Sequence, residues 1–473
     1  MRGFVFFLIL ILMGGAAAQS GRVVATDVPD QTGTPPAPVP TVKQLFEEVN
    51  AYSKAKFNEY AAKKISYSDT LLERTKREQR QLAAKYAALA GAHTYLVGDD
   101  FYYLGMLHWI AENLDGTSAA LRIFIVLESA DPARRQTARS IVVVVLAKQK
   151  KLDEAEKMLT EYVSKEPTKL TERARMEGEL AKAYQAEKDF VRMSPHAEAG
   201  YAASKSLLKD ASSRARGLDE ILDAGMLVYE AYRDNGEREK AEAALDDMRA
   251  LAVSTTSPSF YYYAVDQKIR YLIETGRKPA GLELYRSAIA AASKDFVDKG
   301  QQSDVLMRLK KRDKHYALLG APAPEMPLVD QWFPGKARTF AELRGKVVLL
   351  DFWATWCGPC FDAFPSLREW QQDFAGDGLE ILGVTRYYGS VNSLPVDNAA
   401  EIESFKRFRT NEKLPYDFVI GKDQSIQFLY GATSLPTAVL IDRKGIIRYI
   451  ETGTSPTRLA EMREMIVKLL AEK

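Results

Sequence analysis

Residues 351–360 read DFWATWCGPC and hold the only two cysteines of the 473-residue chain, Cys357 and Cys360. An apolar run, residues 347–353, leads into this stretch. Two thiols three residues apart can close a small disulfide ring when the second lies one helical turn after the first. Such a ring opens and closes reversibly by thiol–disulfide exchange. The spacing therefore predicts a redox-active disulfide rather than a structural one.

The two cysteines are expected to differ in reactivity. The apolar run predicts a strand, and the pattern from Phe361 to Phe374 is typical of a helix that begins at the cysteine pair. A thiol at a helix N-terminus is stabilised as the thiolate by free backbone N–H groups and by the helix dipole. We therefore expect Cys357, at an exposed helix start, to attack a substrate disulfide. Cys360, in the first turn, is expected to resolve the mixed disulfide.

Two other uses of the cysteines fit the sequence less well. A structural disulfide usually closes a long loop, whereas this one would close four residues and restrict the unfolded chain little. A structural zinc site needs about four ligands. The four histidines of the chain all lie far upstream: His93, His108, His196 and His315. We expect no metal and no cofactor beyond a redox-active Cys357–Cys360 disulfide.

The charge balance of the chain argues against one class of partner. Lys and Arg number 65 and Asp and Glu 63, which gives a formal net charge of +2. Such a balance provides no electrostatic reason to expect binding to nucleic acid or to an anionic membrane surface. The length is that of about two to four domains.

The N-terminus has the pattern of a secretory signal. Arg2 precedes an apolar run at residues 4–13, and an alanine-rich segment ending at Ala18 offers a cleavage site. The apolar run is short for a membrane-spanning helix, which needs about 20 residues; an uncleaved N-terminal membrane anchor is the alternative. We expect a signal peptide at 1–18, a disordered Pro/Thr-rich tether at 19–40, and a periplasmic or other extracytoplasmic location.

Residues 41–320 are expected to form an all-α region of helical hairpins. Short polar or glycine-containing turns interrupt the helical pattern repeatedly, and small residues follow these turns. The turn segments resemble tetratricopeptide repeats, although most signature positions are absent and the period is longer than the usual ~34 residues. We predict a degenerate, TPR-like solenoid that begins with helices near 42–64 and 68–92 and ends with a basic helix near 300–317.

The character of the sequence changes after Gly320. Short β-rich runs alternate with helical patterns, which indicates an α/β structure for residues 321–473, joined to the helical region by a Pro-rich linker at 321–324. A turn at 443–445 predicts that the last two strands pair antiparallel, so the sheet should be mixed. The expected strands are 346–353, 379–385, 416–420, 437–442 and 446–451, and the expected helices are 358–374, 401–410, 425–430 and 456–472.

The segment 351–360 resembles the active-site segment of thioredoxins almost letter for letter. The lead-in at 326–346 is similar to that of exported TlpA-like thiol–disulfide oxidoreductases, and residues 386–400 fit an insert that those proteins carry. The resemblance covers about residues 321–473, a third of the chain. It implies a thioredoxin fold and a function in thiol–disulfide exchange.

The resemblance also implies roles for individual residues. Asp351, an acid inside an apolar strand, is expected to be buried with a raised pKa and to take the proton of Cys360. Thioredoxins place a lysine near this acid, whereas here only Arg386 follows the neighbouring strand. Pro365 is expected to kink the active-site helix, and Pro436 to follow a cis peptide bond beside the disulfide. The expected substrate-contacting residues are Trp356, Gly358, Pro359, Leu435, Pro436 and Gly453.

The Gly-Pro dipeptide between the cysteines matches the reducing members of the thioredoxin-like proteins. We therefore expect an enzyme that reduces protein disulfides, with isomerisation as a closely related activity. Because the sequence holds no second redox centre, a membrane or periplasmic donor protein must supply the electrons.

Two other classes of function are considered. A peroxiredoxin would need its cysteine in a T-x-x-C setting, whereas Thr355 lies only two residues before Cys357. In the other class, the TPR-like region binds a partner protein and the redox domain is incidental.

Overall fold

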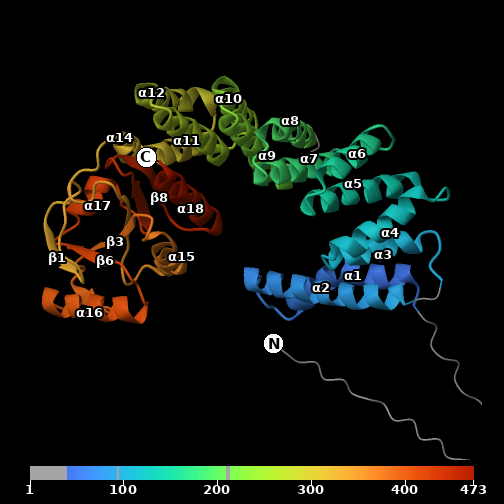
Figure 1. The fold of residues 1–473 in the computed structure, drawn as a ribbon, viewed down its shortest axis with the longest axis horizontal. Coiled ribbons are helices and arrows are strands. Elements are labelled where there is room, and N and C mark those ends of the chain that lie inside the picture. Colours follow the sequence, from blue (N-terminus) through green and yellow to red (C-terminus); the bar gives the residue numbers. More distant parts are fainter. Residues whose placement is uncertain (1–39, 93–94, 209–213, 473) are drawn as a thin grey trace, which may run out of the picture.

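The computed structural model describes residues 40–92, 95–208 and 214–472. The expected signal peptide at 1–18 lies outside these ranges, and so does the expected tether at 19–40 apart from Pro40. A curved array of helices, blue to olive in Figure 1, leads into an α/β domain drawn in orange and red. In the ranges that are described, no helix combines the length and the apolar character needed to span a bilayer.

The helical array consists of hairpins whose turns lie where the sequence predicts them. The Asn113 side chain accepts a hydrogen bond from the Gly116 N–H at 3.0 Å and so caps a helix start. Gly236 and Gly276 end two helices with φ of +78° and +79°, a conformation that glycine adopts without strain. The helices of the array are α1 (Val42–Ala62), α2 (Asp69–Gly91), α3 (Asp100–Ile110), α4 (Leu114–Val126), α5 (Pro132–Lys148), α6 (Leu152–Val163), α7 (Leu170–Ala186), α8 (Phe190–Leu207), α9 (Arg214–Asp234), α10 (Arg238–Ser254), α11 (Pro258–Glu274), α12 (Lys278–Asp295), α13 (Lys299–Lys311) and α14 (Asp313–Leu318).

The first two predicted helices are confirmed, but the basic helix expected near 300–317 is divided. It forms α13 and α14, which meet at Arg312. The Arg312 side chain is buried. The break at Arg312 turns this guanidinium toward the α/β domain, where its partners lie.

The sheet of the α/β domain is mixed, as expected. Its strand order is β1-β6-β3-β2-β7-β8, with β2, β3 and β6 parallel and the other neighbours antiparallel. A separate two-stranded hairpin, β4–β5, lies within the predicted insert at 386–400. The strands are β1 (Val329–Phe333), β2 (Val347–Phe352), β3 (Leu379–Arg386), β4 (Ser390–Val391), β5 (Leu394–Pro395), β6 (Asp417–Gly421), β7 (Thr437–Ile441) and β8 (Ile447–Thr452). The helices are α15 (Gly358–Phe374), α16 (Asn398–Asn411), α17 (Ser425–Tyr430) and α18 (Pro456–Ala471).

The two faces of the sheet are covered by different parts of the chain. Side chains of β2 alternate between the faces. Leu349 and Trp353 belong to a core that includes α15, α16 and α18. Leu350 and Phe352 belong to the opposite core, which α17 joins and which continues through Tyr316 into the helical array. Figure 1 shows α14 beside α17 on this side, while α15 and α18 face the concave side of the array.

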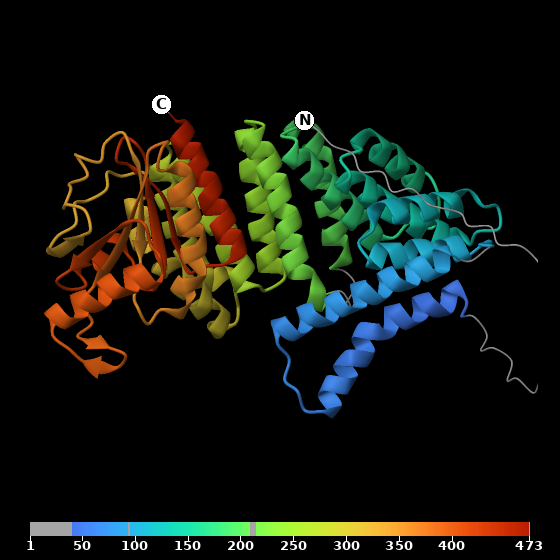
Figure 2. The same cartoon turned by 60° about the horizontal axis from the view of Figure 1, so that its bottom comes forward.

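The hydrophobic core therefore does not stop at residue 320, where we expected one domain to end and the next to begin. The predicted linker at 321–324 is also not free. Pro322 forms an isolated bridge with Ile446, and the Ala323 N–H donates to the Gly445 carbonyl at 2.9 Å. The edge strand β8 leaves backbone groups unpaired, and the linker satisfies some of them. Figure 2 shows the red helix α18 alongside the array, and a Lys468–Glu274 ion pair joins α18 to α11.

Candidate active site

The two cysteines lie where strand β2 passes into helix α15. Cys357 occupies the N-cap position of α15, and Cys360 lies in its first turn, where its N–H donates to the Cys357 carbonyl at 3.0 Å. A disulfide bond joins them. Gly358 and Pro359 form the start of the helix, where a proline costs no hydrogen bond. The strand–turn–helix arrangement predicted for this segment is thus present.

The expectation that Cys357 is exposed is wrong for the disulfide form. Cys357 is only 3% exposed and Cys360 1%. Closure of the ring turns the Cys357 sulfur toward Cys360, and both residues join the core beneath α15. The neighbouring Trp356 is 64% exposed instead, and Gly358 and Pro359 between the cysteines are exposed as well.

Asp351 is buried in the centre of the sheet without a charged partner. Its strand neighbours, Gly383 on β3 and Ala438 on β7, offer no polar side chain. Among the described residues no hydrogen bond reaches its Oδ2 atom, and none joins it to Cys360. Desolvation by burial raises the pKa of Asp351 to about 7. The expected burial and raised pKa are both present, and a carboxyl with this pKa can take or give a proton near neutral pH.

Arg386, the cation that follows β3, does not compensate Asp351. Its guanidinium lies 4.2 Å from the centre of the Tyr388 ring, and its Nε donates to Gln427 at 3.1 Å. The electrostatic setting of Asp351 is therefore governed by burial alone.

A small cavity of about 20 Å³ adjoins Asp351 between the sheet and helices α15 and α18. Pro436, Gly453 and Thr454 are among the residues that line it. A cavity of this size can hold about one water molecule. The Thr454 Oγ1 atom, like Asp351 Oδ2, is buried without a hydrogen-bond partner in the described part of the chain. Two such polar atoms around one cavity are the setting in which proteins hold an ordered water.

The segment before β7 lies at the same end of the sheet as the cysteines. Phe352, the last residue of β2, pairs with Thr437, the first residue of β7. The Leu435–Pro436 bond is cis, as predicted. No hydrogen bond to the main chain of Leu435 occurs within the described ranges, so this main chain is free to pair with an extended peptide.

Gly453 supports this segment from the adjacent strand end. Its N–H donates to the Pro436 carbonyl at 2.8 Å. Its φ is +82°, and a Cβ atom here would lie 2.7 Å from an Arg458 nitrogen. Both facts favour glycine at this position. We call residues 435–436 together with Gly453 the docking edge.

Sequence reasoning missed the residues that hold Trp356 in place. Tyr388 contacts the indole edge-to-face with ring centres 5.3 Å apart. Glu401, buried in the first turn of α16, accepts hydrogen bonds from the Tyr388 and Gly389 N–H groups at 2.8 and 2.9 Å. The insert at 386–400 thereby forms a wall beside the cysteine motif. The sequence carried no signal for this arrangement, because a single glutamate in a polar helical pattern does not reveal that Glu401 is buried.

Pro365 lies inside α15, where it has no N–H to donate to the Phe361 carbonyl. The kink expected at this position stays a prediction. In the described part of the chain, no three His, Cys, Asp or Glu side chains are grouped to hold a metal ion.

Comparison with known proteins places this geometry in a family. A family model described as the AhpC/TSA family matches residues 319–450. The chain is similar to the thiol-disulfide oxidoreductase ResA of Geobacillus thermodenitrificans, with 31% identity over 142 residues, which are 30% of this chain and 74% of ResA. The thioredoxin-like protein YneN of Bacillus subtilis is 29% identical over 144 residues, 30% of this chain and 77% of YneN.

A solved structure described as a thiol:disulfide interchange protein DsbE from Chlorobium tepidum aligns with 32% of this chain and 98% of its own, at 25% identity and a TM-score of 0.28. Because the identity to ResA is above 30% over about three quarters of that protein, the relationship is one of family. The chain, with its C-terminal thioredoxin-like domain, belongs to the ResA family of thiol–disulfide oxidoreductases.

Proposed function

We propose that this protein is an exported reductase of protein disulfides that acts through Cys357 and Cys360. The observation that carries the proposal is the position of the cysteine pair at the start of α15, the helix that follows strand β2, which carries a buried carboxyl whose pKa lies near 7. The reduced cysteine pair supplies the two electrons and closes to the disulfide ring, and the carboxyl supplies a proton acceptor that titrates in the physiological range.

The reaction begins with the reduced protein. The Cys357 thiolate attacks one sulfur of the substrate disulfide, and that bond breaks as a mixed disulfide forms. The displaced substrate sulfur leaves as a thiolate and takes a proton from solvent. Cys360 gives its proton to Asp351, and its thiolate attacks the Cys357 sulfur. The Cys357–Cys360 bond forms, and the second substrate sulfur leaves as a thiolate and is protonated. The substrate gains two electrons and two protons, and the enzyme is left oxidised.

A small cavity adjoins the carboxyl of Asp351, the proposed proton acceptor. In the disulfide form, no hydrogen bond joins Asp351 to Cys360 within the described residues. A water molecule in the cavity would contact the Asp351 carboxyl and the Thr454 hydroxyl. Because neither cysteine lines the cavity, the proposal assigns the transfer from Cys360 to a direct contact with Asp351 in the reduced form, and this water then accepts the proton from Asp351.

A separate dithiol protein has to reduce the Cys357–Cys360 bond after each turnover, because the cysteine pair is the only one in the sequence. The signal peptide expected at residues 1–18 supports a location outside the cytoplasm for this exchange, where glutathione is not the usual redox buffer. In the same proposal the TPR-like array binds the substrate or the donor protein. Its concave side faces α15 and α18, the helices on the cysteine-bearing face of the sheet (Figure 1).

The test is a paired assay on the purified chain that begins at residue 19. We expect it to accelerate the reduction of insulin disulfides by a dithiol reductant and to leave a hydroperoxide unconsumed. Cys357→Ser serves as the matched control and should be inactive in both assays. Hydroperoxide consumption without insulin reduction would instead identify a peroxidase and overturn the proposal.

A further inference from the structure

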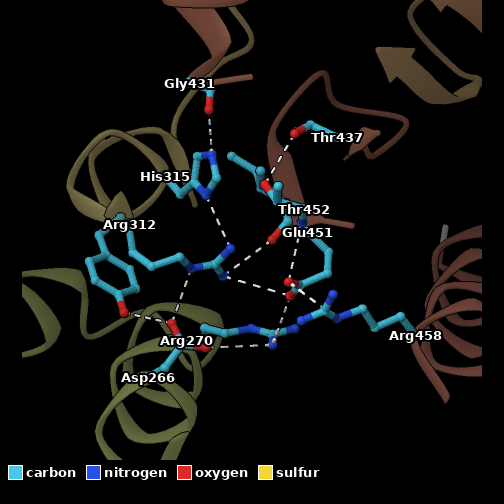
Figure 3. A network of polar contacts seen from close by, with 11 residues as sticks. Asp266, Arg270, Arg312, His315, Gly431, Thr437, Glu451, Thr452 and Arg458 are labelled. Atoms are coloured by element: carbon cyan, nitrogen blue, oxygen red, sulfur yellow. Dashed lines mark hydrogen bonds and ion pairs between the residues drawn. The ribbon is translucent and has the colours of Figure 1, made fainter. Parts of the chain in front are cut away.

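Two side chains of the helical array bind the backbone of the α/β domain (Figure 3). Arg312, between α13 and α14, donates from Nη2 to the Ile450 carbonyl on β8 at 3.3 Å. His315, on α14, makes a hydrogen bond through Nε2 with the Gly431 carbonyl at 2.9 Å. Both side chains are almost fully buried. They are the points at which the array reaches the main chain on either side of the docking edge.

The Arg312 guanidinium is held in one position by compensating charges. Its Nε donates to Asp266 of α11 at 3.2 Å, and the Tyr316 hydroxyl donates to the same carboxylate oxygen at 2.5 Å. Glu451, the residue after Ile450, lies 3.9 Å from Arg312 and 3.7 Å from Arg270 of α11. Buried charges that are paired and hydrogen-bonded in this way fix the geometry of an interface.

The proton of His315 is placed by its neighbours. Arg312 can only donate, so the 3.1 Å contact between its Nη1 and His315 Nδ1 makes Nδ1 an acceptor. The ring proton is therefore on Nε2, which donates to Gly431. Burial and the nearby Arg312 charge lower the pKa of His315 to about 4, so the ring is neutral at physiological pH. Gly431 allows this approach because a Cβ atom there would lie 2.8 Å from the imidazole ring.

These two contacts lie next to the docking edge in the chain. Gly431 opens the segment 431–436, which ends in the cis peptide bond at Pro436. Ile450 and Glu451 precede Thr452, whose hydroxyl is 3.1 Å from that of Thr437. The next residue, Gly453, donates its N–H to the Pro436 carbonyl. His315 thus holds the start of segment 431–436 at Gly431. Arg312 holds strand β8, whose end contacts the end of that segment.

We propose that Arg312 and His315 are positioning residues for substrate docking, through which the helical array fixes the main chain on both sides of Leu435 and Pro436. This inference rests on the proposed function, since it concerns where that function binds its substrate. The inference assigns to α13 and α14 a role in substrate binding by the redox domain, although the matched family region begins only at residue 319. A purely structural interface would instead change stability and leave substrate affinity unaltered.

The experiment compares variants of the chain that begins at residue 19. His315→Leu removes both imidazole hydrogen bonds, and Arg312→Lys keeps the charge but loses the donor to Ile450. Lys468→Ala is the matched control, because it breaks an ion pair between α18 and α11 in the same interface but touches neither side of the docking edge. KM and kcat are measured with insulin. The rate with a small aromatic disulfide, which needs no extended docking, is measured in parallel.

We expect KM for insulin to rise about tenfold in His315→Leu and about fivefold in Arg312→Lys, the effect of losing one or two positioning hydrogen bonds. The rate with the small disulfide should stay within about twofold of the native rate in both, because the cysteines are untouched. Lys468→Ala should match the native protein in every assay. An unchanged KM in folded His315→Leu and Arg312→Lys would overturn the inference, and so would an equal rise in Lys468→Ala.

A second readout separates this inference from the proposed function. Amide hydrogen exchange at residues 432–436 and at Gly453 should be faster in His315→Leu than in the native protein, while exchange within α15 stays the same. If native protein fails to reduce insulin, the proposed function is wrong, and the exchange result still decides whether the array positions the edge. Identical exchange at the edge in both proteins would overturn the inference even if insulin is reduced.

Discussion

Two buried aspartates in this molecule have opposite surroundings. Asp351, on β2 before the cysteine motif, is left without a charged partner. Asp266, on α11 at the contact between the array and the α/β domain, receives hydrogen bonds from Arg312 and Tyr316 and lies 3.9 Å from Arg270. Burial raises the pKa of Asp351 to about 7. At Asp266 burial acts in the same direction, but the two arginines and the tyrosine outweigh it and lower the pKa.

The difference shows how one side chain serves two purposes. A buried carboxyl without partners costs stability when it ionises, and for that reason it exchanges a proton near neutral pH. A buried carboxylate whose oxygens are all engaged stays ionised and fixes its neighbours. The redox centre contains the first kind, and the contact between helical array and α/β domain contains the second. The predictions below test this contrast.

The largest effect should come from the cysteines themselves. Cys357→Ser should abolish insulin reduction, because the attacking sulfur is lost.

Asp266→Asn should retain turnover of a small aromatic disulfide, because it leaves the cysteines and Asp351 in place. Loss of that turnover in folded Asp266→Asn would show that the two regions are not separate in function.

Asp266→Asn should destabilise the protein by about 3–5 kcal/mol at pH 7, because Arg312 and Arg270 lose a buried counter-charge. Urea unfolding followed by circular dichroism measures this change. A loss below about 1 kcal/mol would mean that Glu451 alone compensates both arginines and that Asp266 is not the centre of the network.

Asp351→Asn should stabilise the protein, whereas Asp266→Asn should destabilise it. The unfolded aspartate ionises near its usual pKa of 3.8, whereas the folded one ionises near 7, so ionisation favours the unfolded state as pH rises between these values. The asparagine variant escapes this cost. Its advantage should be near zero at pH 4 and reach about 4 kcal/mol above pH 7. Urea unfolding of both proteins at pH 4 and pH 8 is the measurement, and equal stabilities at pH 8 would show that Asp351 is solvated or paired.

Asp351→Asn should also slow the resolution of the mixed disulfide, since Cys360 loses its proton acceptor. The release step, followed by stopped flow across pH 6–9, should be slower in the variant, while alkylation of Cys357 keeps its pH profile. Equal release rates in the two proteins across that range would remove Asp351 from the mechanism.

His315 predicts a smaller pH effect at the domain contact. Its folded pKa is about 4, below the 6.5 of an unfolded histidine, so the unfolded state binds the proton first as pH falls. Stability contributed by the neutral ring should be complete above pH 6.5 and be lost between pH 6.5 and 4, by about 3 kcal/mol. The charged groups that face the ring are Arg312, Asp266 and Glu451, and His315→Gln leaves all three in place, so it is the reference. The free energy of unfolding should depend on pH differently in the native and His315→Gln proteins only between pH 6.5 and 4.

Much of the redox centre could be predicted from sequence because its signals are local. Helices α15 and α17 begin and end where the sequence predicts. Pro359 lies at the start of α15, and Gly431, in the left-handed conformation, follows the end of α17. Asp351 was identifiable as one acid in an apolar run. The buried Cys357 was not, because exposure in the disulfide form depends on how the ring closes over the core.

The contact between the array and the α/β domain could not be predicted, because its partners are distant in the chain. Arg312 belongs to the basic helix that the sequence predicted at the end of the solenoid, yet its partners Asp266 and Ile450 lie 46 and 138 residues away. The strand β1 was also missed, since it lacks alternation and is ordered by pairing with β6 at the sheet edge. Periodicity reports local structure and carries no information on such pairings.

The central claim is that Cys357 attacks and Cys360 resolves, and one measurement tests it most directly. Cys360→Ser and Cys357→Ser proteins are each reduced, freed of reductant, incubated with a disulfide-bonded peptide and analysed by intact mass spectrometry. The account predicts a single adduct of one peptide on Cys360→Ser, linked through Cys357 and released by dithiothreitol, and no adduct on Cys357→Ser. An adduct that forms on Cys357→Ser but not on Cys360→Ser would contradict it.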